Sequence, residues 1–584
     1  MVQDKLQKLE LTWIGKDDEH EAIEPRILIE DPKYSYGDTE SGNMLIHGDN
    51  LLALKALEQE YSGKVKCIYI DPPYNTGSAF EFYDDNIEHS IWLDLMRKRL
   101  NILRNLLSKD GFICCHIDDS EGHYLKVLMD EVFGRDNYLS TMYIRVRYPD
   151  KALKQDMDFH KEIEYIHVYR KEYGSKPNRK ESSVTFDKYN CYFEEYSEGI
   201  ELSLGGKRVV MFQPNEWKMV NGEGTENGRK EIWATGTILD GNSSGRFFRD
   251  NLNGRFQTDG YGILYKVYGI GDDKFDYRYF TGPQRVGATK GKYYQGVPLE
   301  QLNNSINVKY KPINNFYDLA GSFGNCRTEG GVDFRGGKKP EALIKIILDH
   351  FSNEGDLVLD SFLGSGSTVA VANKMKRKWI GVEMGTQAYT HCFERMRRVI
   401  SGKDKTGITK EENWKGGSGF KFYELAPSLL KEDKFGNLVI NKEYNADMLA
   451  AAMAKQEGYT YQPDATLYWK QGQSSEHDFI YTTTQFLTVE SLDAISETMQ
   501  EEESLLICCT AFQKECQNHA KNITVKKIPQ MLLGRCEFNK DDYSLNIIDM
   551  PQLDLEEELD DDFIEEEPMA TDKSNKPVEG TLFD

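Results

Sequence analysis

Short apolar runs alternate with helix-periodic stretches in two separate parts of the chain. Residues 65–70 (Val-Lys-Cys-Ile-Tyr-Ile) and 111–117 are apolar runs typical of buried parallel strands. Between them, residues 90–103 place apolar side chains at helical spacing, which predicts a crossover helix. Residues 43–47 predict another strand, followed by a helix. This alternation over residues 43–171 is typical of an α/β sheet with helices between its strands.

The same alternation returns near the middle of the chain. A helix is expected to end at His350, followed by strands at residues 356–360 and 378–383. The intervening residues 172–335 are rich in Gly, Asn, Tyr and Phe, and they show short alternating runs without a sustained helix. We therefore predict an α/β protein with one doubly wound, Rossmann-like sheet, built from two chain segments with a domain inserted between them.

The remaining segments complete the expected organisation. Residues 429–550 predict a small α/β unit with strands near 478–482 and 504–508 around a helix at 489–501. The expected units are an N-terminal arm (1–42), a first half-sheet (43–171), an insertion (172–335), a second half-sheet (336–428), the small α/β unit (429–550) and an acidic tail (551–584), which we expect to be disordered.

Asp71-Pro72-Pro73-Tyr74 directly follow the apolar run 65–70. Two consecutive prolines cannot continue a strand ladder, so the backbone must break at this point. The break leaves a carboxylate, a carbonyl fixed by proline and an aromatic ring at the carboxyl end of a strand, where open α/β sheets bind ligands. Two acceptors and a ring can hold a planar base that carries an amino group. Taken alone, the four residues also fit a strand that ends in a proline-rich turn.

A glycine turn follows the strand at 356–360. It runs from Asp360 through Phe362, Gly364 and Gly366 to Ser367-Thr368, where a helix begins. Glycines are needed where a backbone bends sharply and approaches a ligand closely. The turn has neither the third glycine of a dinucleotide fingerprint nor the lysine of a phosphate-binding loop, so it favours a nucleoside ligand without a phosphate.

Four predicted strands end in acidic residues. Glu383 ends a strand about 20 residues beyond the glycines, where a carboxylate suits the hydroxyls of a ribose. Asp49, followed by Asn50, ends the strand at 43–47, and Asp71 and Asp360 end the other two. Because parallel strands present their carboxyl ends at one edge, we expect these acids to line a common site.

The chain resembles the S-adenosylmethionine-dependent DNA adenine-N6 methyltransferases in which the catalytic half precedes the cofactor half. It is more narrowly similar to the Mod subunits of type III restriction–modification systems, which often have alanine where Leu363 stands. The segments that carry this resemblance are Asp71-Pro-Pro-Tyr-Asn-Thr-Gly77, Trp92-Leu-Asp-Leu-Met-Arg-Lys-Arg-Leu100, Asp110-Gly-Phe-Ile113, Ile117-Asp-Asp119, Glu164-Tyr-Ile-His-Val-Tyr-Arg-Lys171 and Gly417-Ser-Gly-Phe-Lys-Phe-Tyr-Glu-Leu425.

The resemblance implies a division of roles. The catalytic residues are expected to be Asp71, Pro72, Pro73 and Tyr74, which would hold the amino group and ring of a flipped-out adenine. S-adenosylmethionine is expected to bind to Asp49, Asn50, Asp71, Lys339, Pro340, Asp360, Phe362, Gly364, Gly366, Ser367, Thr368 and Glu383. Residues 43–171 would then be the catalytic half, 172–335 the target-recognition domain and 336–428 the cofactor half. Methyl transfer from a sulfonium requires positioning and no metal ion.

Three alternatives remain open on the residues alone. Cytosine presents the same amino group at N4, so a cytosine-N4 DNA methyltransferase fits the Asp-Pro-Pro-Tyr segment as well. An RNA substrate is a weaker fit, because no segment resembles an RNA-binding module. A catalytically inactive DNA-recognition subunit could keep the same fold, and cofactor binding would separate it from an enzyme.

The net charge of −24 is unusual for a DNA-binding protein. Residues 554–567 contribute ten acids and no base, whereas residues 373–415 carry eleven Lys and Arg against five acids. Residues 276–311 carry six against two, interleaved with tyrosines and a phenylalanine, a pattern that favours nucleic-acid contact. Double-stranded DNA is therefore the expected partner. By resemblance we also expect a homodimer and a helicase–nuclease restriction subunit.

Cysteine usage and hydropathy indicate the cellular compartment in which the protein is expected. Ten scattered cysteines do not form a disulfide framework, and the vicinal pairs Cys114-Cys115 and Cys508-Cys509 predict buried free thiols. Cys516 and His519 lack a partner pair for zinc. No apolar stretch reaches 18 residues, and the first residues have no signal-peptide core. A cytoplasmic protein of bacterial or phage-related origin, without membrane contact, is expected.

Overall fold

The structure is a computed structural model that describes residues 10–13, 16, 22–75, 89–149, 159–179, 181–183, 186–234, 243–303 and 308–539. The expected acidic tail, the end of the 429–550 unit, Gly77 and parts of the N-terminal arm lie outside these residues.

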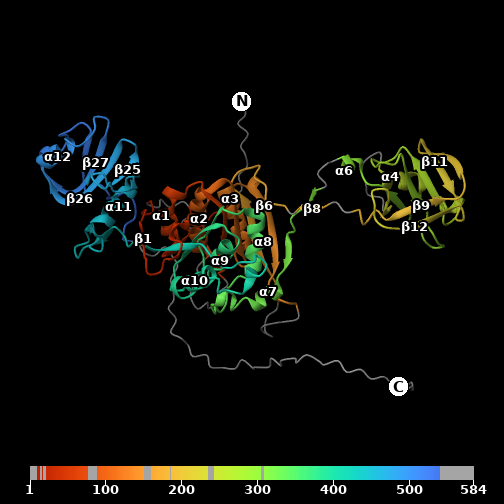
Figure 1. Cartoon of the computed structure of the whole chain (residues 1–584), viewed down its shortest axis with the longest axis horizontal. Coiled ribbons are helices and arrows are strands. Elements are labelled where there is room, and N and C mark those ends of the chain that lie inside the picture. Colours follow the sequence, from red (N-terminus) through yellow and green to blue (C-terminus); the bar gives the residue numbers. More distant parts are fainter. Residues whose placement is uncertain are drawn as a thin grey trace, which may run out of the picture.

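A large mixed sheet forms the centre of the molecule (Figure 1). Its strands lie in the order β1 (Leu28–Glu30), β21 (Gly419–Leu425), β3 (Met44–His47), β20 (Lys378–Glu383), β19 (Leu357–Asp360), β4 (Val65–Ile70), β5 (Leu107–Ile117), β7 (Ile163–Arg170), β6 (Tyr138–Arg145) and β18 (Phe316–Asp318), and β2 (Tyr36–Gly37) also pairs with β21. The strands from β21 to β5 are parallel to one another, whereas β7 is antiparallel to both β5 and β6.

Helices cover both faces of this sheet. On one face, α1 (Asn50–Tyr61), α2 (His89–Leu106) and α3 (Gly122–Phe133) bury Leu54, Leu100 and Leu128 in a common core. On the other, α8 (Glu341–Phe351), α9 (Ser367–Lys374) and α10 (Glu394–Ile400), which continues the π-helix η5 (Ala388–Phe393), bury a second core. The predicted doubly wound sheet made from two chain segments is confirmed.

The strand order reverses its direction between the parallel strands β19 and β4. These strands are neighbours, but β19 leads through α9 to β20 on one side, while β4 leads through α2 to β5 on the other. Such a topological switch point opens a crevice at the carboxyl ends of the strands. Asp360 ends β19 and Asp71 follows β4, so both acids lie at this crevice.

The inserted segment has a sheet of its own. Six antiparallel strands lie in the order β10 (Ile200–Leu204), β11 (Lys207–Phe212), β14 (Leu264–Tyr268), β15 (Tyr277–Thr281), β16 (Lys292–Gln295) and β13 (Lys230–Trp233). One face packs on α4 (Ser244–Phe247) and the π-helix η3 (Phe248–Leu252), and the other on the ribbon of β9 (Cys191–Glu195) and β12 (Trp217–Asn221). Short helices α5 (Phe256–Asp259) and α6 (Leu299–Asn303) complete the unit.

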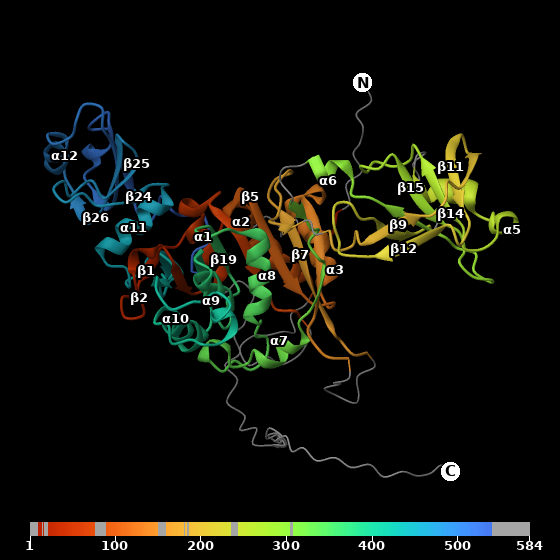
Figure 2. The same cartoon turned by 45° about the vertical axis from the view of Figure 1, so that its right-hand side comes forward.

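Two expectations about the insertion need correction. Its end was expected at residue 335, but β18 pairs with β6 of the central sheet, and α7 (Ala320–Asn325) packs beside it. The inserted body therefore ends before residue 316, and the paired strands β8 (Glu181–Ser183) and β17 (Val308–Tyr310) join it to the centre (Figure 1). In the turned view, its strands β9, β11, β12, β14 and β15 lie together at one end of the molecule (Figure 2). The basic and aromatic pattern of 276–311 was expected to favour nucleic-acid contact, but most of its aromatic residues belong to the core of β15 and β16; Tyr279, Phe280, Tyr293 and Tyr294 are buried.

The C-terminal unit lies on the side of the central sheet opposite to the insertion (Figure 1). It contains the hairpin of β22 (Leu430–Glu432) and β23 (Leu438–Ile440), helix α11 (Ala446–Gln456), and a sheet of β24 (Thr460–Tyr461), β25 (Gly472–Ser475), β26 (Asp478–Leu487), β27 (Ser504–Phe512) and β28 (Ile523–Lys527). Helix α12 (Val489–Ser496) connects the parallel strands β26 and β27, as the sequence predicts. The N-terminal arm packs beneath this unit, where Glu24 accepts hydrogen bonds from Ser428 and Leu429.

All ten cysteines are free and buried, as predicted for a chain without disulfides. Within the described ranges, every helix is too short or too polar to cross a bilayer.

Candidate active site

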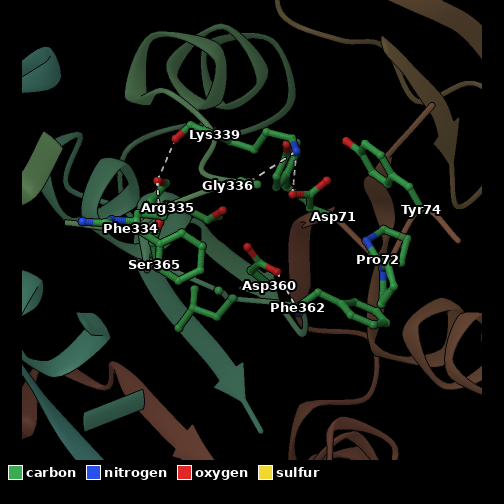
Figure 3. A pocket seen from close by; sticks show the side chains of 17 residues that line it. Asp71, Pro72, Tyr74, Phe334, Arg335, Gly336, Lys339, Asp360, Phe362 and Ser365 are labelled. Carbon is green, nitrogen blue, oxygen red and sulfur yellow. Dashed lines mark hydrogen bonds and ion pairs between the residues drawn. The ribbon is translucent and has the colours of Figure 1, made fainter. Parts of the chain in front are cut away.

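A pocket opens at the switch point between β19 and β4 (Figure 3). Its walls come from the turn after β4, the glycine turn after β19 and the segment that leads into α8. The lining residues are Tyr69, Asp71, Pro72, Pro73, Tyr74, Phe334, Arg335, Gly336, Gly337, Lys339, Asp360, Phe362, Leu363, Gly364, Ser365, Ser367 and Thr368. Two chain regions almost 300 residues apart are thus brought together, as the predicted sheet requires.

Asp71 presents one engaged and one unengaged oxygen in this pocket. Its Oδ2 lies 2.9 Å from the ammonium of Lys339, and Figure 3 shows the lysine reaching toward it. Its Oδ1 is buried, and no hydrogen bond from the described residues reaches it. A buried acceptor without a donor is costly and indicates a position where a ligand donates.

Helix α2 fixes the turn that carries Asp71. The indole of Trp92, which is fully buried, donates a 2.9 Å hydrogen bond to the carbonyl of Pro73. Because this bond engages the Pro73 carbonyl, the turn is held to the helix behind it, and its Asp71 and Tyr74 side chains face the pocket.

Glu164 of β7 links the pocket to the buried side chains of His116 and Tyr69. Its carboxylate accepts from Tyr74 Oη at 3.0 Å and lies 2.9 Å from Nε2 of His116. Nδ1 of His116 lies 2.7 Å from the hydroxyl of Tyr69. Burial would raise the pKa of Glu164, but Lys339, His116 and Tyr74 outweigh it and lower that pKa to about 2. Glu164 is therefore an acceptor at every physiological pH.

The glycine turn is held in shape from behind. Gly364 has φ +55° and Gly366 has φ +78°, values that favour glycine. A Cβ at Gly364 would meet no atom within 4 Å, so this residue borders open space. Glu383 accepts the amide of Gly364 at 2.7 Å and that of Gly385 at 2.9 Å, which fixes the turn to the end of β20.

Asp360 lies beneath the glycine turn and accepts the amide of Phe362 at 2.9 Å. Burial is the main influence on this carboxyl, and the charges of Asp71 and Glu383 act in the same direction. Hydrogen bonds from Thr368 and Phe362 oppose them, and the net effect raises the pKa of Asp360 to about 7.

A buried ion cluster supports the same turn and was not predicted from the sequence. Glu341 pairs with Lys374 at 2.7 Å and with Arg395 at 2.9 Å, and Asp404 pairs with Lys374 at 2.6 Å. Arg395 also donates to Ser367 Oγ, which in turn donates to the carbonyl of Lys339 at 2.7 Å. The cluster thereby links α8, α9 and α10 around the pocket.

Five of the predicted cofactor residues do not line the pocket. Glu383 and Gly366 shape the glycine turn, and Pro340 precedes α8. Asp49 caps α1 through Leu52 and pairs with Arg99 at 3.3 Å. Asn50 donates to the carbonyl of Ser361 at 2.8 Å, so it contacts the turn from the start of α1. Their expected roles stay predictions.

The sequence reasoning missed Glu164, His116 and Tyr69 as members of the site. The run 111–117, which contains His116, was predicted only as a buried strand, and Glu164 was noted only as part of a family segment. The alternation of Ile163–Arg170 marks a half-buried strand, but only pairing of β7 with β5 places Glu164 beside Tyr74.

Comparison with known proteins agrees with this geometry. Residues 65–394 match the DNA methylase family N6_N4_Mtase. A probable type III restriction-modification enzyme, the HindVI Mod subunit of Haemophilus influenzae, is 34% identical over 420 residues, which is 67% of this chain and 54% of the relative. The EcoPI Mod subunit of Escherichia phage P1 is 26% identical over 63% of this chain and 61% of its own. The DNA adenine methyltransferase YhdJ of Escherichia coli is 52% identical over 96 residues, 16% of this chain and 32% of the relative.

This chain thus spans between about half and six-tenths of the length of the two Mod relatives. The family match covers the pocket, the insertion and the central-sheet strands β4, β5, β6, β7, β18, β19 and β20, and it includes both the Asp71–Tyr74 turn and the glycine turn. The chain belongs to the N6_N4_Mtase family of DNA methylases.

Proposed function

We propose that this protein methylates the N6 amino group of adenine in double-stranded DNA, as the modification subunit of a type III-like restriction–modification system. One observation carries the proposal. The buried, unengaged Oδ1 of Asp71 lies in the same pocket as the ring of Tyr74 and the open face of Gly364. The crevice therefore combines an acceptor for an amino group, a ring on which a base can stack and open space at Gly364 for a nucleoside.

The pocket residues fit S-adenosylmethionine as the cofactor. The turn lacks a lysine for phosphate and leaves open space at Gly364, which suits a nucleoside. Phe362, Gly364, Ser365 and Asp360 would hold it, with Asn50 and Glu383 supporting the turn from behind. When bound, the cofactor supplies a methyl group on a positively charged sulfur. Transfer from such a donor depends on alignment, so no metal ion is required.

The chain's own residues position the acceptor. Asp71 Oδ1 would accept one N–H of the amino group and the Pro72 carbonyl the other, which directs the nitrogen lone pair toward the donor. Tyr74 would stack on the base, and its phenol is held by Glu164 at 3.0 Å. A base inside a duplex cannot reach this pocket, so the adenine must flip out at a cost of a few kcal/mol.

Adenine is favoured over cytosine by the relatives. YhdJ bears the name of an adenine methyltransferase and is 52% identical over the segment that it shares with this chain. Cytosine N4 remains the second candidate, since the acceptor geometry of Asp71 suits either amino group.

The partners follow from the type III relatives by analogy. We propose that residues between β8 and β17 read the DNA sequence, that the protein acts as a homodimer in the cytoplasm, and that a helicase–nuclease subunit accompanies it. The two Mod relatives are named as parts of type III enzymes, which supports this assignment.

Expression in a methylation-free host, followed by mapping of modified bases in its genome, tests the proposal. N6-methyladenine within one sequence motif is the expected result, and N4-methylcytosine would favour the alternative. Asp71→Ala should abolish the modification, whereas Asp110→Ala, which removes a mostly exposed carboxylate at the far end of β5, should preserve it. If the Asp71 variant modifies DNA like the wild type, the proposed mechanism is wrong. A wild-type protein that neither binds the cofactor nor modifies DNA would indicate an inactive recognition subunit.

A further inference from the structure

The ammonium of Lys339 lies between two carboxylates at the acceptor end of the pocket. It is 2.9 Å from Oδ2 of Asp71 and 3.8 Å from Oε2 of Glu164. It also lies 4.8 Å from the centre of the Tyr74 ring. The side chain is only 8% exposed, so solvent screens these contacts weakly. The sequence expectation placed Lys339 among cofactor residues, but its charge faces the opposite end of the pocket.

The neighbouring lysine shows that this orientation is specific. Lys338 points away and donates to the carbonyls of Arg327, Glu329 and Val332, at 2.9, 2.7 and 2.8 Å. It therefore anchors the loop before the pocket and does not contribute charge to Asp71. Lys339 alone of the two can act on the acceptor.

Among the described residues that line the pocket, Arg335 at its exposed rim is the only cation besides Lys339. The titratable groups around Asp71 and Lys339 are Tyr69 of β4, Cys115 and His116 of β5, Glu164 of β7, Asp360 of β19 and Tyr74 of the same turn. Two further carboxyls thus surround Asp71. Without a cation, their repulsion and the burial would favour protonation of a carboxylate that must accept a proton donor.

We infer that Lys339 is a positioning residue for the acceptor: it holds Oδ2 of Asp71 so that Oδ1 alone faces the amino group, and Glu164 holds Lys339 in place. This inference rests on the proposed methyltransferase function. Glu164 suits its part because Tyr74 donates to it at 3.0 Å and Nε2 of His116 lies 2.9 Å from it, which holds its carboxylate. The lysine thereby places a positive charge beside Asp71 and restricts the rotation of its carboxylate.

Lys339→Met and Lys339→Arg, compared with wild type, test this role. The methionine variant should lower kcat by about 100-fold, as expected when a reacting group loses its alignment. It should also shift the acid limb of the pH–rate profile to higher pH by about 1–3 pH units, because an opposite charge within hydrogen-bonding distance of a carboxylate has an influence of this size and the variant removes it. The arginine variant keeps the charge and should keep the wild-type profile at a reduced rate. Lys345→Met serves as the matched control, since Lys345 lies in α8, does not line the pocket and pairs with Glu412 at 2.7 Å.

Calorimetry separates positioning from cofactor binding. If Lys339 acts on Asp71, the methionine variant should bind S-adenosylmethionine within about threefold of wild type, a difference below 1 kcal/mol. A large loss of cofactor affinity with an unmoved pH profile would assign the lysine to the cofactor and overturn the inference.

A charge-balanced double variant gives the sharpest outcome. In the wild type, Lys339, Asp71 and Glu164 together carry two carboxylates and one ammonium, so their net charge is −1. The double variant Lys339→Met, Glu164→Gln leaves only the Asp71 carboxylate and so has the same net charge. The acid side of the profile should return toward wild type in this double variant, while kcat stays low because the alignment is not restored. A profile that stays where the single methionine variant places it would overturn the inference. A wild type that methylates no DNA would overturn the proposed function and this inference with it, whereas an active wild type whose methionine variant has an unmoved profile overturns the inference alone.

Discussion

Replacing Asp360 by Asn should stabilise the ligand-free protein at pH 8 and not at pH 4. Asp360 is 2% exposed and ends β19 beneath the glycine turn. Burial, opposed by hydrogen bonds from Thr368 and Phe362, raises its pKa from an ordinary 3.8 to about 7. Asn is nearly isosteric, and its amide oxygen can still accept the Phe362 amide.

The raised pKa fixes the sign and size of the effect. Between about pH 4 and pH 7 the folded protein keeps a proton that the unfolded chain has released, so the free energy of unfolding falls as pH rises through this window. A shift of about three pH units corresponds to about 4 kcal/mol. The Thr368 hydrogen bond is lost in the variant, which costs about 1 kcal/mol. The variant should therefore be about 3 kcal/mol more stable than wild type at pH 8, and about 1 kcal/mol less stable at pH 4.

Thermal melting of both proteins from pH 4 to pH 8, without cofactor or DNA, measures this difference. The variant should melt several degrees higher at pH 8, since about 1 kcal/mol shifts the midpoint of a large domain by a few degrees. Asp110→Asn is a control of opposite sign. Hydrogen bonds from Lys66 and Ser108 lower the pKa of Asp110, so this variant should lose a little stability above pH 4. A melting difference at Asp360 that does not change with pH would refute the assignment of a buried, partly protonated carboxyl.

Other substitutions separate chemistry, cofactor binding and DNA binding. Tyr74→Ala should cripple turnover by loss of stacking, about 1–3 kcal/mol per base, whereas Tyr74→Phe should retain most of it; equal rates in both would exclude stacking. Gly364→Val, at φ +55°, and Glu383→Ala should weaken S-adenosylmethionine binding in calorimetry, and unchanged affinity in both would make the glycine turn a packing device. Lys290→Glu should lower affinity for all DNA sequences and flatten the salt dependence by about one log–log unit per lost phosphate contact, without changing the methylated motif. Exchange of the whole insertion for that of a relative should change the motif, and a chimera that keeps the parent's motif would place recognition elsewhere.

The periodicity of the chain predicted the elements that form the central sheet, because buried parallel strands require continuous apolar runs. The runs at 65–70 and 378–383 are β4 and β20 with the same bounds. The end of the insertion was not predictable in this way, since β18 has only three residues and forms part of the sheet only through pairing with β6. A strand that short has no periodicity of its own.

The four acids at strand ends show the same limit at the site. The sequence predicted one common site for all four acids, but their hydrogen bonds show that they have different roles. Asp49 caps a helix, Glu383 holds glycine amides, and Asp360 supports the turn. Of these four acids, only Asp71 has a buried carboxylate oxygen that receives no hydrogen bond from the described residues. Which acid stays available depends on donors from distant segments, such as Lys339, and no local pattern contains that information.

Charge shows why composition alone could not locate a DNA surface. Residues 373–415 carry eleven cations, but Lys374 and Arg395 are fully buried and are neutralised by Glu341 and Asp404. In 276–311, Arg278 is buried against Asp273, and Lys292 pairs with Glu231 at 2.7 Å. The cations that remain available there include Arg285 and Lys290, both exposed in the loop between β15 and β16. Exposed cations on a hairpin loop can reach a phosphate backbone, whereas those in a core cannot. If the insertion binds DNA through its charge, the cations of this loop are therefore the ones that contact the phosphates. A charge reversal at Lys290, and not at Lys292, tests this contact.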